Sequence, residues 1–249
     1  MLLGLLGVSL PAPACSGPAA PDPDALAILF VGNSLTYSND LPGMLAGLLE
    51  RADIGPVVVE SVALPNYGLE DHWAVGDVSE RIRRGGWDVV VLQQGPSATE
   101  GRPSLLEYSQ RFADLMEPTG ARPALYMVWP AASRSFDFDG VSDSYATAAR
   151  QVDGLLFPAG EAWRKAWAQS PNLALYGPDG FHPSVLGTYL AALVMYEQLS
   201  GKSAVGLPAE IRIGSSTQPL AQAVASLLQD AAHEANRDFA LAPASAIRR

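Results

Sequence analysis

The sequence predicts an α/β protein built on a parallel, doubly wound sheet of about five strands. Short apolar segments alternate with segments of helical pattern along most of the chain. The apolar segments are rich in Val, Ile and Leu, as strands covered on both faces usually are. A length of 249 residues suits one such domain, and a hydrophobic content of 48% allows a sizeable core.

The elements follow one another in regular order after a leader of about 24 residues. The predicted strands are residues 27–31, 57–63, 88–92, 124–129 and 154–158. The predicted helices are residues 41–52, 78–83, 105–116, 141–152, 161–168, 185–199 and 218–236. Three residues of the kind that caps helix N-termini stand near the start of a helix, namely Asp40, Ser104 and Asp139.

The first 24 residues differ from the rest and predict an export signal with a linker, followed by one domain over 25–249. Residues 1–10 are apolar but too few to cross a bilayer as a helix, and small residues and a Pro/Ala/Asp-rich stretch follow. The triplet Ala14-Cys15-Ser16 is similar to the cleavage site of a bacterial lipoprotein. The protein is therefore expected to be secreted, periplasmic or lipid-anchored through Cys15.

Composition excludes several classes of function. One cysteine allows neither an intramolecular disulfide nor a zinc site built from several thiolates. The three histidines, His72, His182 and His233, lie far apart in the sequence, and no metal or other cofactor is expected. A net charge of -10 repels phosphate backbones, so nucleic acid is not an expected partner. No transmembrane helix is expected either.

Two short clusters carry the residues of nucleophilic catalysis. Residues 32–36, Gly-Asn-Ser-Leu-Thr, put Ser34 at a strand-to-helix turn, where a serine also caps a helix. Asp179 and His182 stand three positions apart in what is otherwise a polar turn, so one loop can direct both to one point. A hydroxyl needs a base to become nucleophilic, and the base needs a group that holds its tautomer. The pattern predicts a serine hydrolase.

Several candidate residues follow predicted strands. Ser34, Gly68 and the segment 93–95 each come after a strand, and the carboxyl ends of parallel strands share one edge of the sheet. These groups are therefore expected to gather there. Trp129 ends the fourth predicted strand at the same edge, where it either shapes the pocket wall or lies in the core.

These motifs resemble those of the SGNH, or GDSL-like, hydrolase superfamily, in a bacterial branch whose first block reads Gly-Asn-Ser. The likeness runs from Leu29 to about Ser200. It implies a three-layer α/β/α sandwich of flavodoxin-like type and the activity of an esterase, lipase, thioesterase or carbohydrate deacetylase. It also implies that Ser34 is the nucleophile, His182 the general base and Asp179 its orienting carboxylate.

The resemblance further implies an oxyanion hole formed by the N–H groups of Ser34 and Gly68 and by a side-chain amide. The superfamily usually has Gly-x-Asn-Asp after the third strand, whereas residues 93–95 of this chain read Gln-Gln-Gly. Glutamine carries the same amide donor on a longer side chain. Gln94 is therefore expected as the third donor, with Gln93 as its substitute.

The function expected from the sequence is hydrolysis of acyl esters, short-chain or acetyl, through a Ser-His-Asp triad and an acyl-enzyme. The substrate is expected to be a small-molecule or carbohydrate ester. Two alternatives stay open. One is an inactive carbohydrate- or surface-binding protein on the same scaffold, suggested by the unusual Gln-Gln-Gly at residues 93–95. The other is transfer of the acyl group to a sugar hydroxyl.

Overall fold

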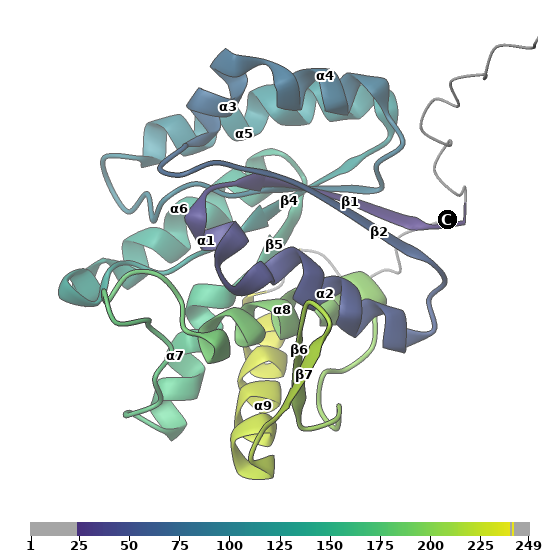
Figure 1. Cartoon of the computed structure of the whole chain (residues 1–249). Coiled ribbons are helices and arrows are strands. Elements are labelled where there is room, and N and C mark those ends of the chain that lie inside the picture. Colours follow the sequence, from purple (N-terminus) through teal and green to yellow (C-terminus); the bar gives the residue numbers. More distant parts are fainter. Residues whose placement is uncertain (1–23, 240, 242–249) are drawn as a thin grey trace, which may run out of the picture.

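The protein folds around a single parallel sheet of five strands, in a computed structural model that describes residues 24–239 and Leu241. The strand order is β2-β1-β3-β4-β5, and every neighbouring pair is parallel (Figure 1). The strands are β1 (Leu26–Gly32), β2 (Val57–Ala63), β3 (Val89–Leu92), β4 (Arg122–Tyr126) and β5 (Leu155–Phe157). This is the flavodoxin-like order that the resemblance implied.

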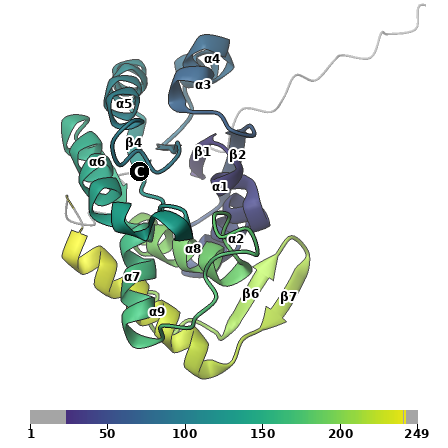
Figure 2. The same ribbon diagram turned by 90° about the vertical axis from the view of Figure 1, so that its left-hand side faces the viewer.

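Helices cover both faces of this sheet and complete a three-layer sandwich (Figures 1 and 2). One layer holds α3 (Leu69–Val75), α4 (Asp77–Arg84), α5 (Arg102–Met116) and α6 (Phe138–Gln151). The other holds α2 (Leu41–Leu49), α7 (Ala159–Gln169), α8 (Val185–Ser200) and α9 (Gln222–Phe239). Short helices join them, namely α1 (Ser34–Tyr37), η1 (Ser38–Asp40), η2 (Glu50–Ala52), η3 (Glu117–Thr119) and η4 (Ala132–Asp137). The predicted fold class is confirmed.

Burial explains why the strands are the most apolar segments. Every residue of β1 and β3 is buried because both strands are central and covered on both faces. The edge strand β2 is more exposed. Helix α8 is buried almost around its whole circumference, since it packs against α2, α7 and α9 and against the end of β5.

The order of the strands creates a crevice at one edge of the sheet. The chain passes from β1 to β2 on one side and then returns to β3 on the other side of β1. Loops after β1 and β3 therefore leave in opposite directions, and ligands of doubly wound sheets bind at this switch point. Ser34 follows β1 and Gln93 follows β3, so the predicted site lies at this crevice.

The structure corrects several element boundaries. Strand β4 ends at Tyr126, so residues 127–129 of the predicted strand lie outside the ladder. The last helix begins at Gln222 and not at 218, because residues 216–219 form a strand. That strand, β7 (Ser216–Pro219), pairs with β6 (Glu210–Ile213) in an antiparallel hairpin, and neither strand was predicted. Helix α3 was not predicted either.

Of the three expected helix caps, one is correct. Asp40 caps α2, and its Oδ1 accepts the N–H of Gly43 at 3.2 Å. Ser104 and Asp139 instead lie inside the first turns of α5 and α6. Both helices begin three residues earlier than their apolar periodicity suggested, at Arg102 and Phe138.

The predicted export signal and linker span residues 1–24. Residues 1–23, which include Cys15, lie outside the described part of the chain, so the export signal stays a prediction. Among the helices of residues 24–239, none is both long enough and apolar enough to cross a membrane.

Candidate active site

The turn after β1 holds Ser34 with its hydroxyl free for chemistry. The side chain of Asn33 caps α1, and its Oδ1 accepts the N–H of Leu35 at 3.1 Å. Ser34 is the first residue of α1 and is not needed as its cap. Asn33 therefore caps the helix, and the hydroxyl of Ser34 is not used as a cap.

The loop before α8 presents a histidine and a carboxylate together. Asp179 Oδ1 accepts the N–H groups of Phe181 and His182, each at 3.0 Å, which closes a tight turn. Gly180 has a φ of 68°, a value that favours glycine in this turn. A β-bridge between Tyr176 and Pro183 closes the base of the loop. The loop thus has a defined shape that fixes both side chains.

The Ser34 hydroxyl, the His182 imidazole and the Asp179 carboxylate form a continuous chain of hydrogen bonds. His182 Nε2 lies 2.8 Å from Ser34 Oγ, and its Nδ1 lies 2.5 Å from Asp179 Oδ2. The hydrogen bond from His182 lowers the pKa of Asp179 to about 2, so this carboxylate is ionised at neutral pH. The three residues named as a triad from the sequence are therefore brought together, 148 positions apart for the serine and histidine.

Two stacked tryptophans of the core, Trp129 and Trp163, support the loop that carries His182. Trp129 is fully buried, and its Nε1 donates to the Phe181 carbonyl at 3.0 Å. Its ring stacks on Trp163 with the centroids 3.6 Å apart. The Tyr176 hydroxyl donates to the Pro130 carbonyl at 2.7 Å. Of the two possibilities for Trp129, the core position is the one observed, and from there it holds the loop.

Asn39 connects the segment that follows Ser34 directly to the loop of His182. Its Nδ2 donates to the Pro183 carbonyl at 3.0 Å and to Thr188 Oγ1 at 2.9 Å. Its backbone has a φ of 54°, in the left-handed region that Asn tolerates better than most residues. The sequence analysis did not identify this contact, since only an Asn-Asp pair before a helix marks it.

His72 supports the end of β1 from inside the protein. Its side chain is buried, and its Nε2 donates to the Gly32 carbonyl at 2.8 Å. Burial is the main cause that lowers the pKa of His72 below its ordinary value. A neutral imidazole therefore anchors the residue two positions before Ser34.

Gln93 is fully buried and connects the turn of Ser34 to β3. Its Oε1 accepts the Asn33 N–H at 2.9 Å and the Thr36 hydroxyl at 2.7 Å. Its Nε2 donates to Asn33 Oδ1 at 3.0 Å and to the Gln94 carbonyl at 2.6 Å. These partners fix the orientation of the amide, because a backbone N–H can only donate and a carbonyl can only accept. A side chain at Gly32 would collide with Gln93 and Thr36.

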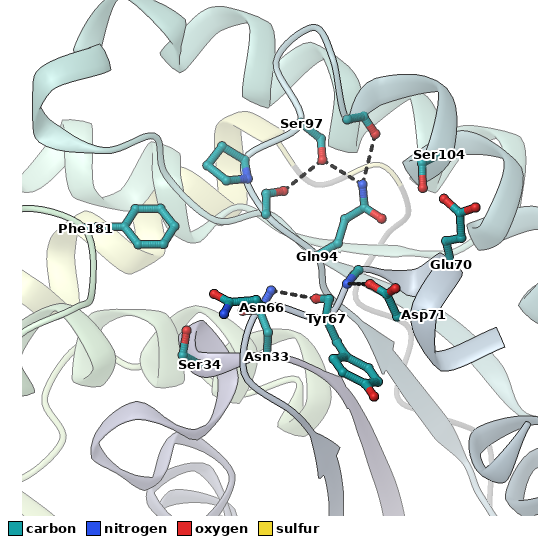
Figure 3. Close-up of a pocket in the computed structure, with 14 residues that line it drawn as sticks. Asn33, Ser34, Asn66, Tyr67, Glu70, Asp71, Gln94, Ser97, Ser104 and Phe181 are labelled. Atoms are coloured by element: carbon teal, nitrogen blue, oxygen red, sulfur yellow. Dashed lines mark hydrogen bonds between the residues drawn. The ribbon is translucent and has the colours of Figure 1, made fainter. Parts of the chain in front are cut away.

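Gln94 is turned away from the serine. Its Nε2 donates to Ser97 Oγ at 2.8 Å and to the Gly101 carbonyl at 2.9 Å (Figure 3). Its Oε1 accepts the Leu69 N–H at 3.3 Å. The Gly101 carbonyl needs a donor and the Leu69 N–H needs an acceptor, so the amide cannot be reversed. Neither Gln93 nor Gln94 has an amide hydrogen left for a substrate oxygen in this arrangement.

Gly68 also has its N–H occupied. The group donates to Asp71 Oδ2 at 2.8 Å, as the N-cap of α3. The N–H of Ser34, in contrast, donates to no group among the described residues. Of the oxyanion donors expected from the sequence, Ser34 alone is thus free of a protein acceptor.

A cavity of about 400 Å³ opens beside Ser34 and runs toward the start of α3 and α5 (Figure 3). Its polar lining includes Asn66, Glu70, Asp71 and Ser104, and no Lys or Arg is among its described lining residues. A second cavity of about 240 Å³ adjoins it and shares Phe181 with it. A ligand can therefore extend in two directions around Phe181.

No group of three or more His, Cys, Asp or Glu side chains within the described part of the chain is arranged to hold a metal ion.

Comparisons with known proteins agree with this arrangement at the level of fold. No family model and no curated protein sequence matches the chain. Among solved structures, a protein from Slackia heliotrinireducens, provisionally described as an SGNH hydrolase, is 27% identical with a TM-score of 0.60. The match covers 70% of this chain and 98% of that chain.

Two further solved structures have the same fold at lower identity. A DUF4886 family protein from Bacteroides uniformis is 17% identical, with a TM-score of 0.67 over 85% of this chain and 95% of that chain. A catalytic mutant of an acetylxylan esterase from Geobacillus stearothermophilus is 16% identical, with a TM-score of 0.53 over 69% of this chain and 93% of that chain. Likeness at this level of identity concerns the fold alone.

Proposed function

Because the chain belongs by its fold to the SGNH/GDSL-like hydrolase superfamily, we propose that it is a serine esterase acting on short-chain or acetyl esters. One observation carries the proposal. Ser34 Oγ lies 2.8 Å from an imidazole nitrogen whose partner nitrogen lies 2.5 Å from an ionised carboxylate. This is the arrangement that activates a serine hydroxyl in acyl transfer.

In the first half-reaction, Ser34 Oγ attacks the carbonyl carbon of the ester while its proton moves to His182 Nε2. Asp179 keeps the other proton of the ring on Nδ1 and stabilises the imidazolium that forms. The Ser34 N–H donates to the oxygen that becomes negative in the tetrahedral intermediate. His182 then gives its proton to the leaving alcohol, and the acyl group stays on Ser34.

In the second half-reaction, His182 accepts a proton from a water molecule, and the resulting hydroxide attacks the acyl carbon. The bond between that carbon and Ser34 Oγ breaks, and the proton returns from His182 to Ser34. The products are a carboxylic acid and the free enzyme. Replacing the water by a sugar hydroxyl gives the acyltransferase reaction with the same residues.

The cavity supports an alcohol portion that carries hydroxyl groups. Side-chain hydroxyl, amide and carboxylate groups along its wall can exchange hydrogen bonds with a polyol. The similarity in fold to an acetylxylan esterase is in line with acetylated carbohydrate as the substrate class. The predicted export signal supports an extracytoplasmic place of action.

The test is hydrolysis of 4-nitrophenyl acetate by the wild type and by Ser34→Ala. The variant loses turnover while its circular dichroism spectrum and Tm stay those of the wild type. Ser226→Ala, the same change on α9 far from the site, keeps wild-type turnover. Wild-type turnover that survives in Ser34→Ala contradicts the assignment of the nucleophile.

Covalent labelling separates the enzyme from an inactive binding protein. An organophosphonate forms an adduct at Ser34 of the wild type, detected by mass spectrometry of the peptide, and none forms with Ser34→Ala. A wild type that neither hydrolyses esters nor forms this adduct is a binding protein on a hydrolase scaffold. Products formed with and without sugar acceptors distinguish hydrolysis from acyl transfer.

A further inference from the structure

The proposed reaction lacks a second donor for its oxyanion. The negative oxygen of a tetrahedral intermediate is usually held by at least two preorganised donors, and each is needed for full turnover. Both amide hydrogens of Gln94 are held by Ser97 and Gly101, and the Gly68 N–H is held by Asp71. Another group near Ser34 has to supply this contact.

The side-chain amide of Asn66 is free to donate a hydrogen bond to the oxyanion. Asn66 lines the same cavity as Ser34, and its amide makes no hydrogen bond with any residue that the structure describes. Figure 3 draws the Asn66 side chain on the Ser34 side of the cavity, whereas the Gln94 amide nitrogen is directed to the opposite wall. Asn66 is exposed to solvent, so its amide exchanges hydrogen bonds with water and gives up no protein partner when it donates to a substrate.

The backbone around Asn66 is held rigidly to the nucleophile turn. The next residue, Tyr67, accepts Asn33 Nδ2 at its carbonyl at 2.9 Å and donates its own N–H to Leu64 at 3.2 Å. Asn33 itself immediately precedes Ser34 and caps its helix. The position of Asn66 relative to Ser34 is therefore fixed through one residue, Asn33.

Asn66 also has an unfavourable backbone conformation. Its φ is 62°, in the left-handed region, where glycine is the usual residue and Asn is among the side chains that tolerate it best. Residues in such conformations cluster at sites where a side chain must be directed to one point. An asparagine here combines the turn with an amide donor, which a glycine would not.

We propose that the Asn66 side-chain amide, together with the Ser34 N–H, forms the oxyanion hole in the place expected for Gln94. The proposal rests on the esterase function proposed above. Gln94 and Gly68 then have structural roles: Gln94 Oε1 accepts the Leu69 N–H, and Gly68 is the N-cap of α3. Asn66 stabilises the tetrahedral intermediate by an N–H that donates to its negative oxygen.

Two variants of Asn66 test the assignment with 4-nitrophenyl acetate. Asn66→Gly removes the amide and suits the positive φ, while Asn66→Asp keeps the shape and replaces the donor by a carboxylate. In both, kcat falls by about 10²–10³, the usual effect of removing one oxyanion donor, and KM changes little. Asp53→Gly, at a remote residue with a φ of 50°, keeps the wild-type kcat.

The outcomes distinguish this proposal from the proposed function. If Ser34→Ala abolishes turnover but both Asn66 variants keep kcat within about threefold of the wild type, the esterase stands and the assignment of Asn66 is overturned. A fall of kcat in Asn66→Gly that Asn66→Asp does not share also overturns it, because the backbone then causes the loss. A wild type with neither turnover nor Ser34 adduct overturns both proposals.

Discussion

At the scale of single residues, the carboxylate of Asp179 has two separate tasks. One oxygen accepts two backbone N–H groups and shapes the turn, and the other lies 2.5 Å from His182 Nδ1. Asp179→Asn can keep the first task and lose the second, because its NH₂ group then faces Nδ1. The imidazole proton is moved to Nε2, where it prevents removal of the Ser34 proton.

For Asp179→Asn, kcat for 4-nitrophenyl acetate is predicted to fall by about 10⁴, as in the serine protease triad, while the fold is kept. Steady-state kinetics near neutral pH measure the effect, with the circular dichroism spectrum as the control for folding. A variant that keeps more than about a tenth of wild-type kcat shows that this carboxylate does not orient the base.

The same carboxylate makes stability depend on pH. Its pKa is about 2 in the fold, below the ordinary value of about 3.9 in an unfolded chain, because His182 and the turn favour the ionised form. Its stabilising effect is fully present above about pH 4 and is lost as the pH falls through about 2. Urea unfolding at pH 5 and pH 2 should show a larger loss for the wild type than for Asp179→Asn. Equal losses contradict this prediction.

Residue chemistry could be predicted from sequence where it depends on order and spacing. Ser34 follows an apolar strand, and Asp179 and His182 share one short loop, so their meeting follows from the fold. The direction of an amide does not follow, because Gln94 has two donors and its acceptors, Ser97 and Gly101, are found only in the folded loop. For the same reason Asn66 has no signal of its own in the sequence beyond its position two residues before Gly68.

At the scale of elements, Asn39 joins two segments that carry the reacting groups. It lies in η1, directly after the helix of Ser34, and holds the Pro183 carbonyl and Thr188 at the start of α8. It touches no reacting atom, so it is a positioning residue. Without the two hydrogen bonds of Asn39, the distance between Ser34 Oγ and His182 Nε2 depends only on packing between more distant residues.

Asn39→Gly is predicted to lower kcat by between about 10 and 10² with KM unchanged, since small displacements of reacting groups are costly. Gly suits the φ of 54°, so the change adds no backbone strain. Loss of two hydrogen bonds lowers the free energy of unfolding by about 2 kcal/mol. Asp53→Gly serves as the matched control, and a variant with wild-type kcat would show that the tie has no role in alignment.

Elements were predictable where hydrophobic burial dictates them. The runs that became β1, β3 and β5 are apolar throughout because both faces of the sheet are covered. The hairpin of β6 and β7 was missed because β7 is exposed along its whole length and has no apolar alternation. Its pairing with β6 is fixed by backbone hydrogen bonds, which leave little trace in side-chain patterns.

At the scale of the whole molecule, the negative charge of the protein and of its cavity act together. The net charge is -10, and Glu70 and Asp71 line the cavity beside Ser34. A negatively charged ester therefore enters against repulsion that a neutral ester does not meet. The exposed position of both carboxylates makes this repulsion sensitive to salt.

We predict that 4-acetoxybenzoate is hydrolysed with a kcat/KM about fivefold lower than its neutral methyl ester at low salt, the effect of about 1 kcal/mol of repulsion. The difference shrinks as salt shortens the Debye length from about 30 Å at 0.01 M to about 3 Å at 1 M. Glu70→Gln removes one of the two negative charges of the cavity and so reduces the difference in kcat/KM between the two esters at low salt. Equal rates for the two esters at 0.01 M salt contradict the prediction.

The alternation of segments predicted the general architecture, while the strand order was implied only by the family resemblance. Alternation of strands and helices indicates a doubly wound sheet, because a parallel connection requires a crossover helix. Pairing of β1 with both β2 and β3 depends on contacts between segments far apart in the chain. Periodicity describes single segments and has no information on which of them become neighbours.

The long separation between Ser34 and His182 has a consequence for biogenesis. A polypeptide kept extended for passage through a membrane has an ordinary, unreactive hydroxyl at position 34, because its base is supplied by a loop made 148 residues later. In the proposed enzyme, the hydroxyl becomes reactive only once the loop of His182 has packed beside the turn after β1.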